Sequence, residues 1–235
     1  LLREARRLAG ERGFSIAAVQ GRMLEQNHAS GLVARLVDAF VSGLPDAERE
    51  DLLRSAAAPA LELQLGAIAA NPPADSAAAI ASALYRLCER LGEHGPMLAA
   101  VDDLHWADRG SVYALQYLAA RVDDLQLVLV MSMRTGESVA GPDPREALDE
   151  WDAAVGIAAR PLGEAASARL LEVLLGEVDP SFAEAAYAAT RGNPFLLREL
   201  ALTVAREHAD LDERTVAAIA EEVPDSIRRW AVRRL

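Results

Sequence analysis

The chain has 235 residues, enough for one large domain or two small ones. Its formal net charge of −12 at pH 7 argues against a nucleic-acid surface within this segment, because binding DNA needs clustered Lys or Arg. Cys88 is the single cysteine, so an internal disulfide is excluded. No stretch approaches the roughly 20 apolar residues of a membrane span. We therefore expect a cytoplasmic protein that contacts no membrane.

The first hundred residues predict alternating helices and strands, in a composition rich in Ala, Leu, Arg and Glu. A strand is expected over residues 14–19. Helices are expected over residues 1–9, 31–40, 47–53, 60–69 and 76–91. The apolar run from Met97 to Val101 predicts a strand buried on both faces, as in a parallel sheet covered by helices.

The alternation continues to about residue 162 and then stops. Strands are expected over residues 125–133 and 155–158, and helices over 111–122 and 144–151. After residue 162 the pattern predicts helices only, over 164–175, 180–190, 193–208 and 212–222. We therefore expect an α/β lobe over residues 1–162, built on a parallel sheet, and an all-helical lobe over residues 163–235.

Two adjacent carboxylates, Asp102 and Asp103, follow the buried apolar run. Ligands of open α/β sheets bind just beyond the carboxyl ends of the strands. A phosphate-transfer ATPase holds Mg²⁺ at such a place, because the cation prefers carboxylate oxygen and bridges it to the nucleotide phosphates. Two acids at a strand end are also typical of a solvated turn, so the pair alone leaves both interpretations open.

The chain contains no lysine, and every basic residue is arginine. A P-loop, GxxxxGK[ST], needs its lysine on the β- and γ-phosphates, so no P-loop is present in these residues. The chain is either a fragment that begins just after its P-loop or a degenerate relative without one, and we expect the fragment.

Several motifs carry a resemblance to a known family. The run from Val101 to Asp108, VDDLHWAD, resembles the Walker B segment of AAA-type signal-transduction ATPases with numerous domains, the STAND class. These modules are best known from large ATP-binding regulators of the LuxR family. The opening LLREA resembles the helix after the P-loop, residues 127–134 resemble the sensor-1 strand, and RGNPFLL at 191–197 resembles the family's Gly-x-Pro motif. The resemblance spans nearly the whole chain in the right order.

The resemblance implies a P-loop NTPase-like parallel sheet flanked by helices, here without its central P-loop strand, followed by an all-helical lobe. It implies that Asp102 holds Mg²⁺, that Asp103 positions the attacking water, and that Arg134 contacts the γ-phosphate of ATP. A guanidinium suits that last task because it is always charged and can bind phosphate oxygens bidentately. The alternative for Arg134 is a surface ion pair with Glu137.

In the helical lobe, the resemblance places Pro194 and the adjacent Asn193 at the nucleotide, with the proline near the adenine. A proline also fits the first turn of a helix that an asparagine caps. The two interpretations are compatible.

The implied function is an ATP-binding and ATP-hydrolysing switch module of a LuxR-like transcriptional regulator, with ATP and Mg²⁺ as cofactors. It would be an ATPase in the intact parent and inactive as this fragment. One alternative is a non-catalytic, ATPase-like scaffold; another is an ATPase module coupled to a cyclase or kinase domain. The expected partners are a nucleotide, an effector protein or small-molecule inducer, DNA only through missing domains, and a second copy of the chain through self-association.

Two residues that closely follow the acidic pair in the sequence, His105 and Asp108, are expected to have structural rather than catalytic roles. Asp108 is expected to cap a helix rather than bind a metal. His105 is expected to hydrogen-bond locally rather than act as a base. If the P-loop strand is missing, the strands ending at Val101 and Met133 are expected to face an empty slot lined with unpaired N–H and C=O groups, which would make the chain prone to aggregate or partly unfolded.

Overall fold

The computed structural model describes residues 1–25, 30–54, 74–134 and 155–207, and the chain divides into two units, Leu1–Gly156 and Ile157–Leu235. The helices expected over 60–69, 144–151 and 212–222 lie outside the described residues.

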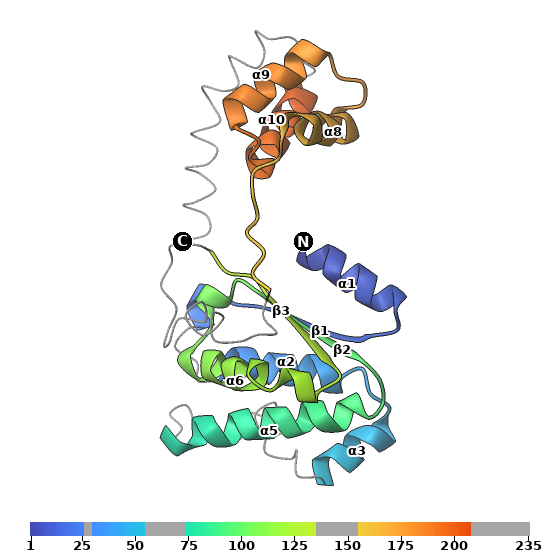
Figure 1. Ribbon diagram of the computed structural model, residues 1–235, viewed down its shortest axis with the longest axis vertical. Coiled ribbons are helices and arrows are strands. Elements are labelled where there is room, and N and C mark those ends of the chain that lie inside the picture. Colours follow the sequence, from blue (N-terminus) through green and yellow to red (C-terminus); the bar gives the residue numbers. More distant parts are fainter. Residues whose placement is uncertain (26–29, 55–73, 135–154, 208–235) are drawn as a thin grey trace. The chain divides into compact units, whose positions relative to one another are not determined.

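The first unit is built on a three-stranded parallel sheet with the order β1-β2-β3 (Figure 1). The strands are β1 (Ser15–Gln20), β2 (Met97–Asp102) and β3 (Leu127–Met131). In the register of the sheet, Val101 lies opposite Val19 of β1 and Met131 of β3. The predicted α/β class with a parallel sheet is confirmed, and the carboxyl ends of all three strands meet at one edge.

Helices lie on both sides of this sheet (Figure 1). On one side pack α2 (Gly31–Val41), α5 (Ala74–Gly92) and α6 (Arg109–Ala119), with α3 (Asp46–Arg54) beside the end of α5. On the other side lies α1 (Leu2–Glu11). Three short 3₁₀ turns complete the described elements: η1 (Met23–Glu25), η2 (Leu104–Trp106) and η3 (Val122–Asp124).

Strand β2 is buried on both faces, as its unbroken apolar run predicts. Met97, Ala99 and Val101 point into the larger core beneath α2, α5 and α6. Leu98 and Ala100 point into a smaller core that α1 covers, with Ala9 as the buried residue of that helix. Because successive residues of a strand face opposite sides, a strand in this position needs apolar residues throughout.

The expected empty slot beside the strand ending at Val101 is wrong. β2 pairs with β1 along one side and with β3 along the other, and the pairing extends beyond β3, where the Ser132 N–H donates to the Val101 carbonyl at 2.9 Å. The most apolar strand takes the central place, so both of its backbone edges are used. Among the described strands, only the outer edges of β1 and β3 lack a partner strand.

The strand expected over residues 155–158 does not form. Val155 and Ile157 are 82% and 79% exposed, and the backbone there is irregular. Alternating apolar residues favour a strand only where a neighbouring strand edge can accept their hydrogen bonds, and none of the described strands pairs with this segment.

The second unit is helical throughout its described elements: α8 (Glu164–Leu175), α9 (Pro180–Thr190) and α10 (Pro194–Glu207). These bounds agree with the helices predicted from the sequence to within a residue. Their apolar faces meet in a core that includes Leu171, Phe182, Leu197 and Leu200, with Leu162 packed against it. None of the described helices in either unit combines the length and apolar character needed to cross a membrane.

Candidate functional site at the carboxyl end of the central strand

The acidic pair lies where β2 ends. Asp102 is the last residue of the strand, and Asp103 follows in the left-handed backbone region, with φ 53° and ψ 48°. Aspartate is one of the few non-glycine residues that enter this region readily. The turn at Asp103 directs the chain into η2, and both carboxylates remain partly exposed at the carboxyl edge of the sheet.

Gly21 brings the end of β1 against this turn. Its N–H donates to the Asp102 carbonyl at 2.8 Å. A Cβ atom at Gly21 would lie 2.3 Å from the Asp103 carbonyl oxygen and 3.1 Å from the Trp106 Cβ, so a side chain cannot fit there without moving the backbone. Glycine is therefore required for the close approach of the two strand ends.

Ser132, the first residue after β3, orients Asp102. Its hydroxyl donates to Asp102 Oδ1 at 2.5 Å and accepts from the Asp103 N–H at 3.1 Å. The Asp103 N–H also lies 3.1 Å from Asp102 Oδ1. One oxygen of the Asp102 carboxylate is thus held by two donors, while no described residue donates a hydrogen bond to the other oxygen, Oδ2.

Gln20, the last residue of β1, orients Asp103. Its side-chain amide donates to Asp103 Oδ2 at 2.8 Å, and its own carbonyl accepts from Arg35 Nη2 at 2.8 Å. His105 lies on the other side, buried, with Nε2 4.0 Å from Asp103 Oδ1, which is beyond hydrogen-bond distance. Donors from both neighbouring strands therefore fix the two carboxylates of the central strand.

The donor set fits a small, hard cation that completes its shell with water and phosphate oxygen. Mg²⁺ is usually bound through one or two carboxylates plus substrate phosphates, not by a cage of protein ligands. Among the described residues, no group of three or more His, Cys, Asp or Glu side chains is placed to hold a metal. The acidic pair, in which Asp102 Oδ2 accepts no hydrogen bond from a described residue, matches binding of Mg²⁺ through one or two carboxylates.

Arg134 is at the same edge of the sheet, two residues beyond Ser132, and is partly buried. Its alternative partner, Glu137, lies outside the described residues. The structure therefore brings three of the predicted site residues, Asp102, Asp103 and Arg134, to the ends of two adjacent strands.

The other two predicted site residues, Asn193 and Pro194, belong to the second unit. Asn193 Oδ1 accepts from the N–H groups of Phe195 at 3.0 Å and Leu196 at 3.4 Å, and Pro194 is the first residue of α10. The predicted capping arrangement is confirmed. Gly192 precedes it with φ 70°, and a Cβ there would lie 1.9 Å from the Leu162 carbonyl oxygen, so this turn also needs glycine.

Asp108 caps a helix, as the sequence predicts, and also joins two helices. It is 3% exposed, and its Oδ1 accepts from the N–H groups of Ser111 at 2.9 Å and Ser30 at 2.7 Å. Its Oδ2 accepts from the Ser111 hydroxyl at 2.6 Å, and Ser111 Oγ accepts in turn from the Val33 N–H at 3.1 Å. With these roles filled, Asp108 supports the amino ends of α2 and α6 beside the acidic pair.

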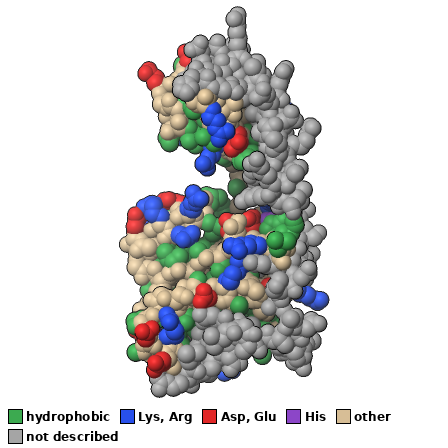
Figure 2. All heavy atoms as spheres, turned by 180° about the vertical axis from the view of Figure 1, so that it is seen from behind, with side chains coloured by type: hydrophobic (Ala, Val, Ile, Leu, Met, Phe, Trp, Pro, Cys, Tyr) green, Lys and Arg blue, Asp and Glu red, His purple; other side chains and the backbone are tan. Residues whose placement is uncertain are grey.

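The charges on the surface are mixed. On the face of the first unit shown in Figure 2, arginine and acidic side chains are interspersed among apolar and neutral groups, without a continuous basic surface over the described residues.

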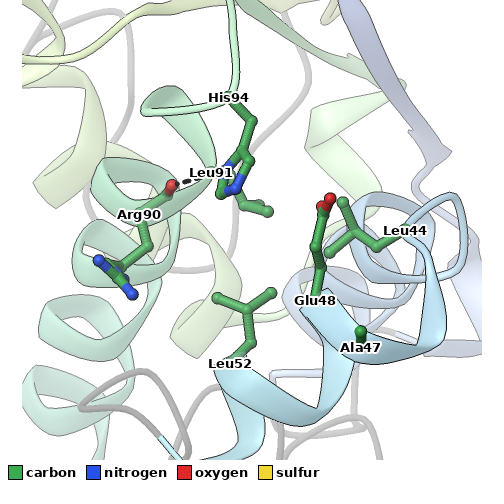
Figure 3. Close-up of a pocket in the computed structure, with 7 residues that line it drawn as sticks. All are labelled: Leu44, Ala47, Glu48, Leu52, Arg90, Leu91 and His94. Carbon is green, nitrogen blue, oxygen red and sulfur yellow. Dashed lines mark hydrogen bonds between the residues drawn. The ribbon is translucent and has the colours of Figure 1, made fainter.

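A pocket of about 280 Å³ lies elsewhere in the first unit, between α3 and the end of α5 (Figure 3). Apolar, charged and imidazole side chains line it together: Leu44, Ala47, Glu48, Leu52, Arg90, Leu91 and His94. α5 leads into the amino end of β2, whereas Asp102 lies at the carboxyl end of that strand. The pocket therefore lies toward the opposite edge of the sheet from Asp102. None of the predicted site residues lines it.

Sequence reasoning identified the acids but missed Gln20, Gly21 and Ser132. A usable signal was present: Gln20 and Gly21 directly follow the strand predicted over residues 14–19, and Ser132 lies one residue before the end of the strand predicted over 125–133. Residues at the ends of adjacent parallel strands share one edge. Comparisons with models of known protein families, with curated proteins and with solved structures found no match to this chain.

Proposed function

We propose that the chain is the ATP-binding and ATP-hydrolysing switch module of a LuxR-like transcriptional regulator, built on a P-loop NTPase-type α/β unit and a helical unit. One observation carries the proposal: two carboxylates at the carboxyl end of the central parallel strand, held by donors from both neighbouring strands, with Arg134 at the end of the next strand. A cytoplasmic location and control by an effector or inducer belong to the same proposal.

The residues divide the work in this proposal. Asp102 would hold Mg²⁺, since Ser132 leaves its Oδ2 open. Asp103 would orient the attacking water, with its carboxylate kept in place by the Gln20 amide. Arg134 would contact the γ-phosphate of ATP, a task that suits a permanently charged guanidinium. When bound, Mg²⁺ would supply positive charge that links carboxylate oxygen to the nucleotide phosphates.

Calorimetry with ATP tests the binding part of the proposal in the full-length natural protein. ATP binding should need Mg²⁺, and Asp102→Asn should remove this Mg²⁺-dependent binding of ATP. The chain offers a matched control, because the tetrapeptide Val-Asp-Asp-Leu occurs twice, at 101–104 and at 122–125. Asp123 occupies the position of Asp102 in the second copy but is exposed on η3, before β3 begins. Asp123→Asn should therefore bind ATP as the unmodified protein does.

The 235-residue chain by itself should bind ATP weakly or not at all. It contains no lysine and no P-loop, whose backbone N–H groups supply most of the phosphate affinity. Micromolar binding by this chain would mean that the phosphate site is built from other residues.

A second candidate, a non-catalytic scaffold with an ATPase-like fold, is favoured by the same absence of a P-loop lysine from these residues. The two candidates predict different results in the calorimetry experiment. A full-length protein that binds no ATP with or without Mg²⁺ would support the scaffold and contradict the ATPase module. Coupling of an ATPase module to a cyclase or kinase domain would leave the binding result unchanged.

A further inference from the structure

We propose that Ser132 is a positioning residue that makes Asp102 a one-oxygen ligand and thereby selects Mg²⁺ over Ca²⁺ at the acidic pair. The inference rests on the proposed function, in which Asp102 is the cation ligand. It adds a residue and a selectivity that the resemblance to ATPases does not assign.

The backbone of Ser132 is fixed before its side chain acts. Its N–H donates to the Val101 carbonyl at 2.9 Å, and its carbonyl accepts from the Leu104 N–H at 2.8 Å. These two bonds join the end of β3 to residues on both sides of the acidic pair. The position of the hydroxyl therefore follows from the sheet pairing, and a substitution that removes only the hydroxyl leaves both backbone bonds in place.

The hydroxyl occupies one side of the Asp102 carboxylate. It donates to Oδ1 at 2.5 Å, and the Asp103 N–H reaches the same oxygen at 3.1 Å. The Asp103 N–H also lies 3.1 Å from Ser132 Oγ, so the three groups form a closed triangle. A carboxylate held in this way cannot turn both oxygens toward one cation, and Oδ2 is the oxygen that remains.

The number of oxygens that a carboxylate offers distinguishes the two cations. Ca²⁺ takes six to eight oxygen ligands at flexible geometry and accepts bidentate carboxylates. Mg²⁺ demands a near-octahedral shell, keeps several waters, and is bound through single oxygens of one or two carboxylates. Locking Oδ1 to Ser132 therefore disfavours the larger cation while it pre-orients the one oxygen that Mg²⁺ needs.

The test uses the 235-residue chain and Mn²⁺, whose binding is followed by the loss of its free signal in electron paramagnetic resonance. Salt at roughly 0.15 M screens the diffuse attraction of an acidic chain for cations. Mg²⁺ and Ca²⁺ are then titrated separately to displace Mn²⁺, and the ratio of their displacing concentrations measures selectivity. Asp102→Asn should remove the binding event, and Asp123→Asn should leave it intact.

In Ser132→Ala, the Mg²⁺ concentration needed for displacement should rise about tenfold, the lower range for loss of a group that orients a metal ligand. The Ca²⁺ concentration should stay the same or fall, because Asp102 can then offer both oxygens. Ser132→Thr keeps the hydroxyl and should keep the selectivity of the unmodified chain. A matched control is Ser42→Ala, which removes a serine hydroxyl that donates to Asp38 on α2, away from the site.

The outcomes separate this inference from the proposed function. If Asp102-dependent binding is present but Ser132→Ala leaves the Mg²⁺ to Ca²⁺ ratio unchanged, or weakens both cations equally, Ser132 does not set selectivity and the inference fails while the cation site stands. If the unmodified chain shows no Mn²⁺ binding that depends on Asp102, the cation site itself is refuted, and the inference fails with it.

Discussion

Removing the buried carboxylate of Asp108 should destabilise the first unit by about 3 kcal/mol. Asp108→Ala deletes a helix N-cap, which costs about 1 kcal/mol on average. It also leaves the buried Ser30 N–H without the acceptor that it reaches at 2.7 Å, and an unsatisfied buried donor costs roughly 1–3 kcal/mol. The Ser111 hydroxyl loses its acceptor too, but it can rotate toward another group.

Asp108→Asn should cost much less, about 1 kcal/mol. The amide oxygen can replace Oδ1 as the acceptor for the Ser30 and Ser111 N–H groups, and only the Oδ2 contact to the Ser111 hydroxyl is lost. Asp38→Ala is the matched control, because Asp38 also accepts a serine hydroxyl but is exposed on α2. An exposed substitution of this kind should stay within about 0.5 kcal/mol of the unmodified chain.

Urea unfolding at pH 7 measures these differences, with the accessibility of the single thiol as the probe. Cys88 is fully buried on α5, which packs against α6, so its reaction with a thiol reagent reports unfolding of the first unit. The change in the urea midpoint multiplied by the slope gives the difference in the free energy of unfolding. An Asp108→Ala chain within 1 kcal/mol of the unmodified one, or an Asn variant as unstable as the Ala variant, would refute the reasoning.

Three further predictions concern individual residues. Gly21→Ala should lower stability by about 2–3 kcal/mol in the same urea assay, because the added Cβ would overlap the Asp103 carbonyl. Gly156→Ala is the control and should have no effect, since a Cβ there meets nothing within 4 Å. Equal urea midpoints for the two variants would contradict the close approach at Gly21. Burial raises the pKa of the Cys88 thiol to about 12 from an ordinary 9.0, so the stability that the protonated thiol contributes is intact below pH 9 and is lost as the pH rises toward 12. The loss of stability at alkaline pH should therefore be smaller in Cys88→Ala. An identical loss in both chains would argue against a buried thiol. Hydrogen bonds from the Ser181 side chain and backbone lower the pKa of Asp179, so the stability that its carboxylate contributes is present above the unfolded pKa of 3.8 and is lost at more acid pH. Thermal melts between pH 5 and pH 2, followed by the helical signal, should therefore show a weaker acid dependence in Asp179→Asn.

The parts of the fold that depend on local patterns could be predicted from the sequence. The unbroken apolar run of β2 indicated a strand buried on both faces, and the helices of the second unit follow from apolar spacing and capping residues such as Asn193. Asp108 was predicted as a cap because its type and position before a helix define that role.

The parts that depend on pairing between distant segments could not be predicted in the same way. The alternating residues at 155–158 indicated a strand, but a strand needs a neighbouring edge, and no described strand supplies one. The roles of Gln20 and Ser132 depend on the parallel register that sets their strand ends beside Asp102 and Asp103. The left-handed turn at Asp103 was not predicted, because an aspartate tolerates this backbone region but does not by itself indicate it, and the close approach of Gly21 to this turn joins two distant segments.

Steady-state ATP turnover by the full-length protein tests the central claim most directly, with Asp103→Asn compared against Asp124→Asn. Both substitutions fall at the third position of a Val-Asp-Asp-Leu tetrapeptide, but only Asp103 lies at the carboxyl edge of the sheet. Loss of a water-positioning acid should lower kcat about a hundredfold or more while ATP binding stays measurable, because its interaction strengthens mainly in the transition state. Asp124→Asn should turn over ATP at the unmodified rate. Unmodified turnover in Asp103→Asn, or an equal loss in both variants, would contradict the assignment of the acidic pair as the hydrolytic centre.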